Sequence, residues 1–173
     1  MRFLVDAMLG KLAKWLRILG HDTLLISPEL RDDEILEMDP DGRVFLTRDK
    51  ELLKRMVKRG VASLEVPERQ EEALALLSLE LGLRLRIDPK TTRCPFCNSP
   101  MFRINKKDLD NLPKEVIKGN NIFLKCYKCG NVYWFATHYW QMLNMLLRAR
   151  SIKVKMDLGQ LYKANDDWRR LRT

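Results

Sequence analysis

Residues 3–20 read FLVDAMLGKLAKWLRILG, and the fold follows from this stretch. Its first three residues are apolar, which is long enough for one buried strand, and the strand ends at Asp6. From Leu9 onward the apolar residues recur at helical spacing, and Gly20 supplies a C-terminal stop. The pattern therefore predicts a strand that delivers a carboxylate to its C-terminal edge, where a helix begins at once. In open α/β sheets, ligands bind at that edge.

The other face of the predicted helix is basic and carries an aromatic residue. It comprises Lys11, Lys14, Trp15 and Arg17. An acid beside such a helix suits a metal ion bound together with a phosphate chain. The same residues also fit a simple strand end followed by a solvated helix face, so this stretch alone leaves both interpretations open.

Length and charge narrow the class of protein. The 173 residues allow one ordinary domain, or a compact domain with a small module, and 46% hydrophobic residues suffice for a core. The net charge of +9 divides into −2 over residues 1–89 and +11 over residues 90–173. A basic half attracts polyanions, which suits a nuclease but equally a ribosome-binding or membrane-surface protein. Without an apolar run of membrane-spanning length or a signal peptide, we expect a cytoplasmic protein with no membrane partner.

Strand-like and helix-like segments alternate through the first half of the chain. This alternation predicts a parallel α/β sheet flanked by helices over residues 1–87. The composition changes near Asp88, where cysteines and turns begin, so residues 88–140 form a second, small module and residues 141–173 a helical and basic tail. The expected strands after the first are 23–26, 44–47 and 61–66, and the expected helices are 32–38, 49–60, 68–81 and 139–150.

All four cysteines lie in two CxxC pairs separated by 28 residues: Cys94 and Cys97, then Cys126 and Cys129. Each pair places two thiolates on one knuckle, and two knuckles complete a tetrahedral zinc site. Disulfides are the alternative, but a cytosolic setting disfavours them. Strand-like segments between and after the pairs predict a zinc ribbon whose metal is structural, because no coordination position is left for water.

Carboxylates follow three successive predicted strands: Asp6, the pair Asp32 and Asp33, and Asp49. In a parallel sheet these positions share one edge, and gathered carboxylates repel one another unless a divalent cation lies among them. Oxygen ligands favour Mg²⁺ or Mn²⁺, which activates water and stabilises a phosphoryl transition state. Each Asp taken singly also fits an ordinary helix cap. We expect one of Asp32 and Asp33 to cap its helix and the other to face the site.

Four motifs occur in the order expected for one family: residues 5–17, 20–23, 32–36 and 43–49, followed by the cysteine pairs. Over residues 2–142 the chain resembles the PIN-like ribonuclease domain with a C-terminal zinc ribbon, named after the C-terminal part of the Mut-seven exonuclease. The resemblance implies a PIN-type α/β/α fold and metal-dependent RNA cleavage. It places the metal-binding acids at Asp6, at Asp32 or Asp33, and at Asp49. The PIN pattern has a further acid two residues beyond the third, and here that residue is Glu51.

The sequence therefore predicts an endonucleolytic, metal-dependent ribonuclease that cleaves single-stranded RNA. Asp6, Asp33 (or Asp32) and Asp49 would hold Mg²⁺ or Mn²⁺ as catalytic acids, while the ribbon and tail add affinity for RNA. The alternative is a non-catalytic protein that binds RNA, tRNA or the ribosome and keeps a vestigial acid cluster. A toxin-like nuclease with an inhibitor partner is a third interpretation. The side chains predicted to bind substrate phosphates are Lys11, Lys14, Arg17 and Arg48.

Overall fold

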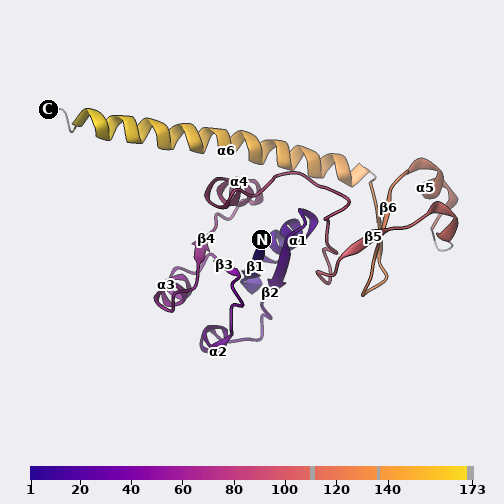
Figure 1. The fold of residues 1–173 in the computed structure, drawn as a ribbon, viewed down its shortest axis with the longest axis horizontal. Helices are drawn as coiled ribbons and strands as arrows, with labels where there is room; N and C mark the ends of the chain where they lie inside the picture. The colour runs from indigo at the N-terminus through magenta and orange to yellow at the C-terminus, as the bar shows by residue number, and fades with distance from the viewer. Residues whose placement is uncertain (110–111, 136, 171–173) are drawn as a thin grey trace.

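The computed structural model describes residues 1–109, 112–135 and 137–170, with the side chains of 137 and 160–170 left out. Its first part is a four-stranded parallel sheet in the order β2-β1-β3-β4 (Figure 1). The strands are β1 (Arg2–Val5), β2 (Asp22–Leu25), β3 (Val44–Thr47) and β4 (Ser63–Glu65). They are joined and followed by η1 (Ala7–Leu9), α1 (Gly10–Ile18), α2 (Asp32–Glu37), α3 (Lys50–Lys58) and α4 (Gln70–Leu81).

Alternation along the strands buries both faces of the sheet. Phe3 and Val5 point into one core cluster together with residues of α1, α4 and the C-terminal helix. Leu4 and Phe45 point into a second cluster with residues of α2 and α3. The sheet is therefore the middle layer of an α/β/α sandwich, and the predicted α/β fold class is confirmed.

The strand order creates a topological switch point between β1 and β3. The chain passes from β1 to β2 on one side and then returns to add β3 on the other side of β1. Since α1 after β1 covers one face and α3 after β3 covers the other, the connections after these two neighbouring strands diverge at their carboxyl ends. This is where the fold favours a ligand site.

The cysteine module is built on a three-stranded antiparallel sheet in the order β5-β6-β7 (Figure 1). Its strands are β5 (Met101–Arg103), β6 (Phe123–Cys126) and β7 (Val132–Trp134), close to the predicted ribbon strands. Between β5 and β6 lie η2 (Lys106–Asp108) and α5 (Lys114–Gly119), which the sequence interpretation did not predict.

A single long helix, α6 (Thr137–Arg170), replaces the predicted short helix and basic tail (Figure 1). It lies along α4, and its Leu146 and Ala149 are buried in the first core cluster. Arg150 Nη2 donates a hydrogen bond of 2.5 Å to the Leu85 carbonyl oxygen. The N-terminal part of α6 therefore completes the core of the parallel sheet. The domain boundaries predicted at 87/88 and 140/141 stay a prediction. No helix in the described part of the chain is both long and apolar enough to cross a bilayer.

Gly20 shows how closely the second part of the chain approaches the first. Its φ is +91°, and an added Cβ would lie 2.9 Å from Thr91 Oγ1 and 3.0 Å from the Thr91 carbonyl oxygen. The helix stop predicted at this glycine is confirmed, since α1 ends at Ile18. A side chain here would be strained by its backbone and would push the linker to the cysteine module away.

His21 predicts an acid-sensitive stability. Its ring packs edge-on against Phe3, with centroids 5.7 Å apart, and burial together with the positively charged N-terminus lowers the pKa of His21 to about 4. The unfolded chain takes up this proton near pH 6.5, so acidification from pH 6.5 to 4 favours unfolding. We expect a loss of about 1–3 kcal/mol over this range, measured by urea denaturation.

The His21→Phe variant should show a flatter dependence of unfolding free energy on pH than the wild type. Protonation of the cysteines is common to both proteins and cancels in the comparison. Identical slopes for the two proteins between pH 6.5 and 4 would contradict the assignment to His21.

Candidate nuclease site and cysteine cluster

Asp6 and Asp49 lie at the switch point and are joined through Thr47. Asp6 directly follows β1, and its backbone amide donates to the Leu46 carbonyl oxygen of β3 at 3.0 Å. The Thr47 hydroxyl donates to Asp6 Oδ2 at 2.5 Å and accepts from the Asp49 amide at 2.9 Å. The ends of β1 and β3 therefore hold the two acidic segments in one hydrogen-bonded network.

Asp49 is also the N-cap of α3. Its Oδ1 accepts from the amides of Glu51 at 2.8 Å and Leu52 at 3.0 Å, so this oxygen is fixed in position. Within the described residues, Oδ2 of Asp49 and Oδ1 of Asp6 have no hydrogen-bond partner. Glu51 turns outward and pairs with Lys54 at 2.7 Å.

Asp32 and Asp33 lie in the first turn of α2 and face a cation. Arg55 of α3 pairs with Asp33 and lies 3.8 Å from Asp32 Oδ2. Neither aspartate caps the helix by its side chain: Arg31 is the N-cap residue, and its amide donates to Glu34 at 2.8 Å. The expectation that one of the two caps α2 is therefore wrong, because the helix begins at Asp32 and both aspartates lie inside its first turn.

The structure links Asp6 and Asp49 through Thr47, but no three of the four aspartates gather in the described part of the chain. Among the described residues, only the cysteines form a group of three or more ligating side chains within 4.8 Å of one another. Asp6 and Asp49 nevertheless each keep one carboxylate oxygen free of hydrogen bonds within the described chain. Mg²⁺ is commonly held by one or two carboxylates together with substrate phosphates, which matches this donor set. The roles of Asp32 and Asp33 as ligands stay a prediction.

A groove of about 910 Å³ opens beside this edge, between the start of α1, the loop after β3 and the first cysteine knuckle. Five cationic side chains line it against a single carboxylate, Glu68, which lies 3.6 Å from Arg48. Two polar atoms in its wall, Arg48 Nε and Gln70 Oε1, are buried without a partner in the described chain. The excess of cationic side chains gives the groove a positive potential that suits an anionic ligand. The cations are Lys11, Lys14, Arg17, Arg48 and Arg69.

Arg17 differs from the other cations of this groove because it is only 8% exposed. Its guanidinium donates to the carbonyl oxygens of Thr23 at 3.0 Å, Pro95 at 2.9 Å and Phe96 at 3.1 Å. Burial lowers the pKa of Arg17, while the nearby Cys94, Cys97 and Asp22 oppose that shift. The predicted solvated helix face therefore does not extend to Arg17, which ties α1 to the cysteine module.

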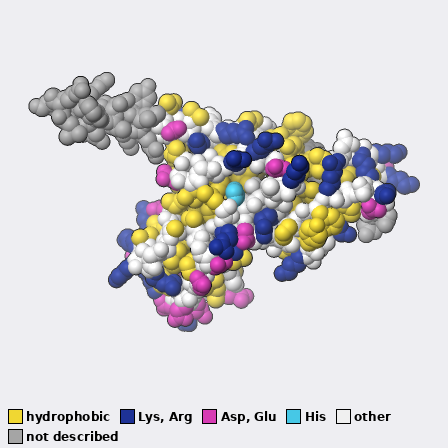
Figure 2. All heavy atoms as spheres, viewed as in Figure 1, with side chains coloured by type: hydrophobic (Ala, Val, Ile, Leu, Met, Phe, Trp, Pro, Cys, Tyr) yellow, Lys and Arg dark blue, Asp and Glu magenta, His cyan; other side chains and the backbone are white. Residues whose placement is uncertain are grey.

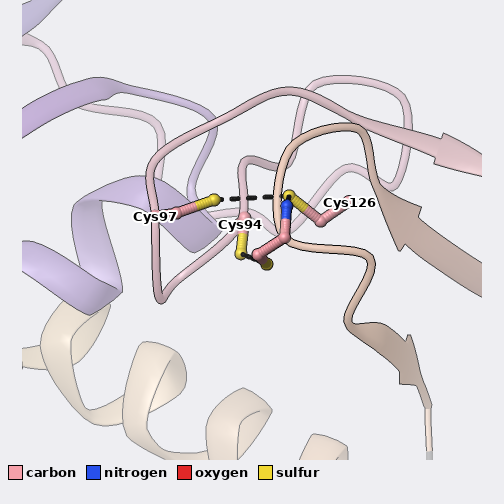
Figure 3. Close-up of side chains that lie close together, drawn as sticks. Cys94, Cys97 and Cys126 are labelled. Carbon is pink, nitrogen blue, oxygen red and sulfur yellow. Dashed lines mark hydrogen bonds between the residues drawn. The ribbon is translucent and has the colours of Figure 1, made fainter.

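The four cysteines form one cluster with two close pairs of sulfur atoms (Figure 3). Cys97 Sγ lies 3.3 Å from Cys126 Sγ, and Cys94 Sγ lies 3.7 Å from Cys129 Sγ. Burial opposes ionisation of Cys126, but hydrogen bonds from the Cys129 amide, the Cys97 thiol and the Lys128 amide outweigh it and lower the pKa of Cys126 to about 6. Four thiols from two knuckles fit tetrahedral zinc, so the cluster could hold the predicted structural metal.

The parallel sheet flanked by helices and the four-cysteine cluster together define an α/β protein with a small module that could bind zinc. The family model described as Mut7-C RNAse domain matches residues 1–146, and the chain belongs to this family. The family resemblance predicted from the sequence motifs is thereby confirmed. Searches of curated proteins and of solved structures gave no significant match.

Three residues at this edge were missed by sequence reasoning: Thr47, Arg55 and Phe96. Thr47 stands in the last position of a predicted strand, two residues before Asp49. A hydroxyl at this position could have been predicted to hydrogen-bond the neighbouring acids. Arg55 looks like any cation on an amphipathic helix, so no sequence signal separates it from its neighbours. Phe96 lies between two predicted zinc ligands, which hides its position in the groove.

Proposed function

We propose that this protein is a metal-dependent ribonuclease that cleaves single-stranded RNA internally, with Mg²⁺ or Mn²⁺ as catalytic metal. The observation that carries the proposal is the pair Asp6 and Asp49, linked through Thr47 at the switch point and bordered by a cationic groove. Membership of the Mut7-C RNAse domain family supports RNA as the substrate. The divalent ion would activate water and stabilise charge on the phosphate.

The chain's own residues position the reacting groups. Thr47 fixes the orientation of the Asp6 carboxylate, and the amides at the start of α3 fix that of Asp49. In the proposed hydrolysis, the water oxygen bonds to phosphorus, the bond from phosphorus to one ribose oxygen breaks, and that oxygen takes up a proton. Lys11, Lys14 and Arg48 bind the neighbouring phosphates.

Arg17 has a positioning role in this proposal. All three of its hydrogen bonds go to backbone carbonyl oxygens, two of them in the first knuckle. It therefore fixes the groove wall and leaves the phosphates to Lys11, Lys14 and Arg48.

The charge distribution supports a polyanionic ligand that extends beyond the groove. Acidic side chains gather over α2 at the lower end of the molecule, whereas the charged side chains around the cysteine module are mostly basic (Figure 2). The basic module would attract the chain of phosphates, and the acidic end would repel it. We propose that RNA runs from the cysteine module into the groove beside α1.

The direct test incubates the purified, zinc-loaded protein with a mixed pool of RNAs, with and without added Mn²⁺ and without chelator. We expect Mn²⁺-dependent products from internal cuts in single-stranded segments. Binding of RNA without any metal-dependent product would favour the non-catalytic alternative. In that case, the pairing of Asp32 and Asp33 with Arg55 would mark an acid cluster already neutralised by the protein.

The Lys14→Ala variant should bind single-stranded RNA more weakly and with a smaller salt dependence. Loss of one phosphate contact makes the negative slope of log K against log salt shallower by about 0.7. Fluorescence anisotropy at several salt concentrations measures this slope. Lys58→Ala is the matched control, because Lys58 is also an exposed lysine and lies at the end of α3 on the other side of the sheet. Equal slopes for the two variants would show that Lys14 makes no phosphate contact with the RNA.

A further inference from the structure

We propose that Phe96 is a stacking platform for one nucleobase of the RNA. Its side chain is 73% exposed, yet it lines the same groove as Lys11, Lys14 and Arg48. A single exposed aromatic residue needs no explanation on a protein surface. An aromatic ring beside cations that would track a backbone is, however, the combination that binds single-stranded nucleic acid.

The backbone that carries Phe96 is fixed on both sides. Arg17 Nη1 donates to the carbonyl oxygens of Pro95 and Phe96, at 2.9 and 3.1 Å. Phe96 itself stands between Cys94 and Cys97 of the metal cluster. An aromatic side chain on a fixed backbone loses little conformational freedom when a base stacks on it, so more of the stacking free energy appears as affinity.

Asn98 anchors the other end of the knuckle to the parallel sheet. Its Nδ2 donates to Asp22 Oδ1 at 2.6 Å, and its Oδ1 accepts from the Thr23 amide at 3.0 Å. These contacts are made with β2, the edge strand beside α1. The cysteine module therefore presents Phe96 to the groove from a position set by the nuclease fold.

Tyr127 provides the internal comparison. It stands between the cysteines of the second knuckle and is 68% exposed, as Phe96 is on the first. Its ring leans on Phe102, with centroids 4.5 Å apart, and it does not line the groove. The two exposed knuckle aromatics therefore differ in that only Phe96 lies beside the cations of the groove, whereas Tyr127 packs against Phe102.

The ligand class is a single-stranded RNA whose bases are unpaired, and base identity matters little because every base has a stacking face. The inference deepens the proposed function and assumes that RNA enters this groove. It adds a base contact to a site whose other contacts are with phosphates. Selectivity for single strands follows, since paired bases are not available to the ring.

The experiment compares two oligonucleotides of equal length, one of ordinary RNA and one with abasic sugars throughout, in buffer without added divalent ion. Fluorescence anisotropy gives the dissociation constant of each for the wild type and for Phe96→Ala, Phe96→Leu and Phe96→Tyr. We expect Phe96→Ala and Phe96→Leu to weaken binding of ordinary RNA by roughly 5- to 150-fold, with Phe96→Tyr close to wild type. Binding of the abasic strand should change less than about twofold in every variant.

Tyr127→Ala is the matched control and should bind both strands as the wild type does. Zinc content and circular dichroism identify any variant that loses the knuckle, and Phe96→Leu preserves apolar packing if Phe96→Ala does not fold. Unchanged affinity of Phe96→Leu for ordinary RNA, or an equal loss of affinity for both strands, would contradict base stacking on Phe96. Cleavage is measured separately, so failure of the nuclease proposal leaves this result interpretable.

Discussion

Asp6→Asn should reduce Mn²⁺-dependent RNA cleavage by at least about 10²–10³-fold, the loss typical when one electrostatic contact to a reacting centre is removed. Asp6 ends β1 at the switch point, and the change removes its charge while keeping an oxygen that accepts from Thr47. The fold and the RNA affinity should therefore stay near wild type. Initial cleavage rates of a labelled single-stranded RNA at saturating Mn²⁺ measure the effect.

Asp41→Asn is the matched control for this change. Asp41 is exposed, pairs with Arg2, and lies in the turn before β3, at the opposite edge of the sheet from Asp6. The Asp41→Asn variant should cleave the labelled RNA at the wild-type rate. If Asp6→Asn, with unchanged thermal stability, also cleaved at the wild-type rate, the acidic edge would have no part in catalysis.

Cys126→Ser should abolish stable zinc binding and lower the stability of the whole fold. The change removes one of four thiols, and the small antiparallel sheet has little apolar surface with which to replace the metal. Arg17 would then lose its fixed acceptors at Pro95 and Phe96 while remaining buried. We expect zinc to fall from about one ion per chain to almost none. The free energy of unfolding should fall by about 3–5 kcal/mol, as is typical when a buried charge loses its partners.

Zinc content after gel filtration and urea denaturation of the parallel sheet measure the two effects. Lys128→Ala, an exposed change on the same knuckle, should alter neither. A Cys126→Ser protein that retained one zinc ion per chain and wild-type stability would show that the cluster does not support the fold.

The layered fold was predictable because each of its signals is local. An apolar run ending at Asp6, followed by helical spacing up to Gly20, specifies a strand and a helix whatever the tertiary contacts. Two CxxC pairs likewise specify their knuckles through spacing alone. The strand order was not contained in these signals. It places β3 beside β1, and with it Asp49 near Asp6.

Arg17 illustrates why the rest of the site could not be read from the sequence. On a helical wheel it shares the basic face of Lys11 and Lys14, and nothing nearby in the chain distinguishes it. Its burial is caused by residues 95 and 96, almost 80 positions later. Phe96 was obscured for the same reason, since its neighbours in the groove come from the first part of the chain.

The aspartates of α2 show a different limit. Their position at the start of a helix was correctly predicted, but α3 places Arg55 opposite them and gives both carboxylates a cation partner. Which acids serve a metal therefore depends on a contact between two helices, and helix spacing does not encode that contact.

The most direct test of the account is the binding of Mn²⁺ itself, followed by electron paramagnetic resonance of the free ion in titrations of zinc-loaded protein. We expect the wild type and Asp41→Asn to bind Mn²⁺ equally. Asp6→Asn and Asp49→Asn should each bind it at least about tenfold more weakly, since each loses a carboxylate ligand. Equal Mn²⁺ binding by the wild type, Asp6→Asn and Asp49→Asn would contradict the claim that the edge between β1 and β3 holds the catalytic metal.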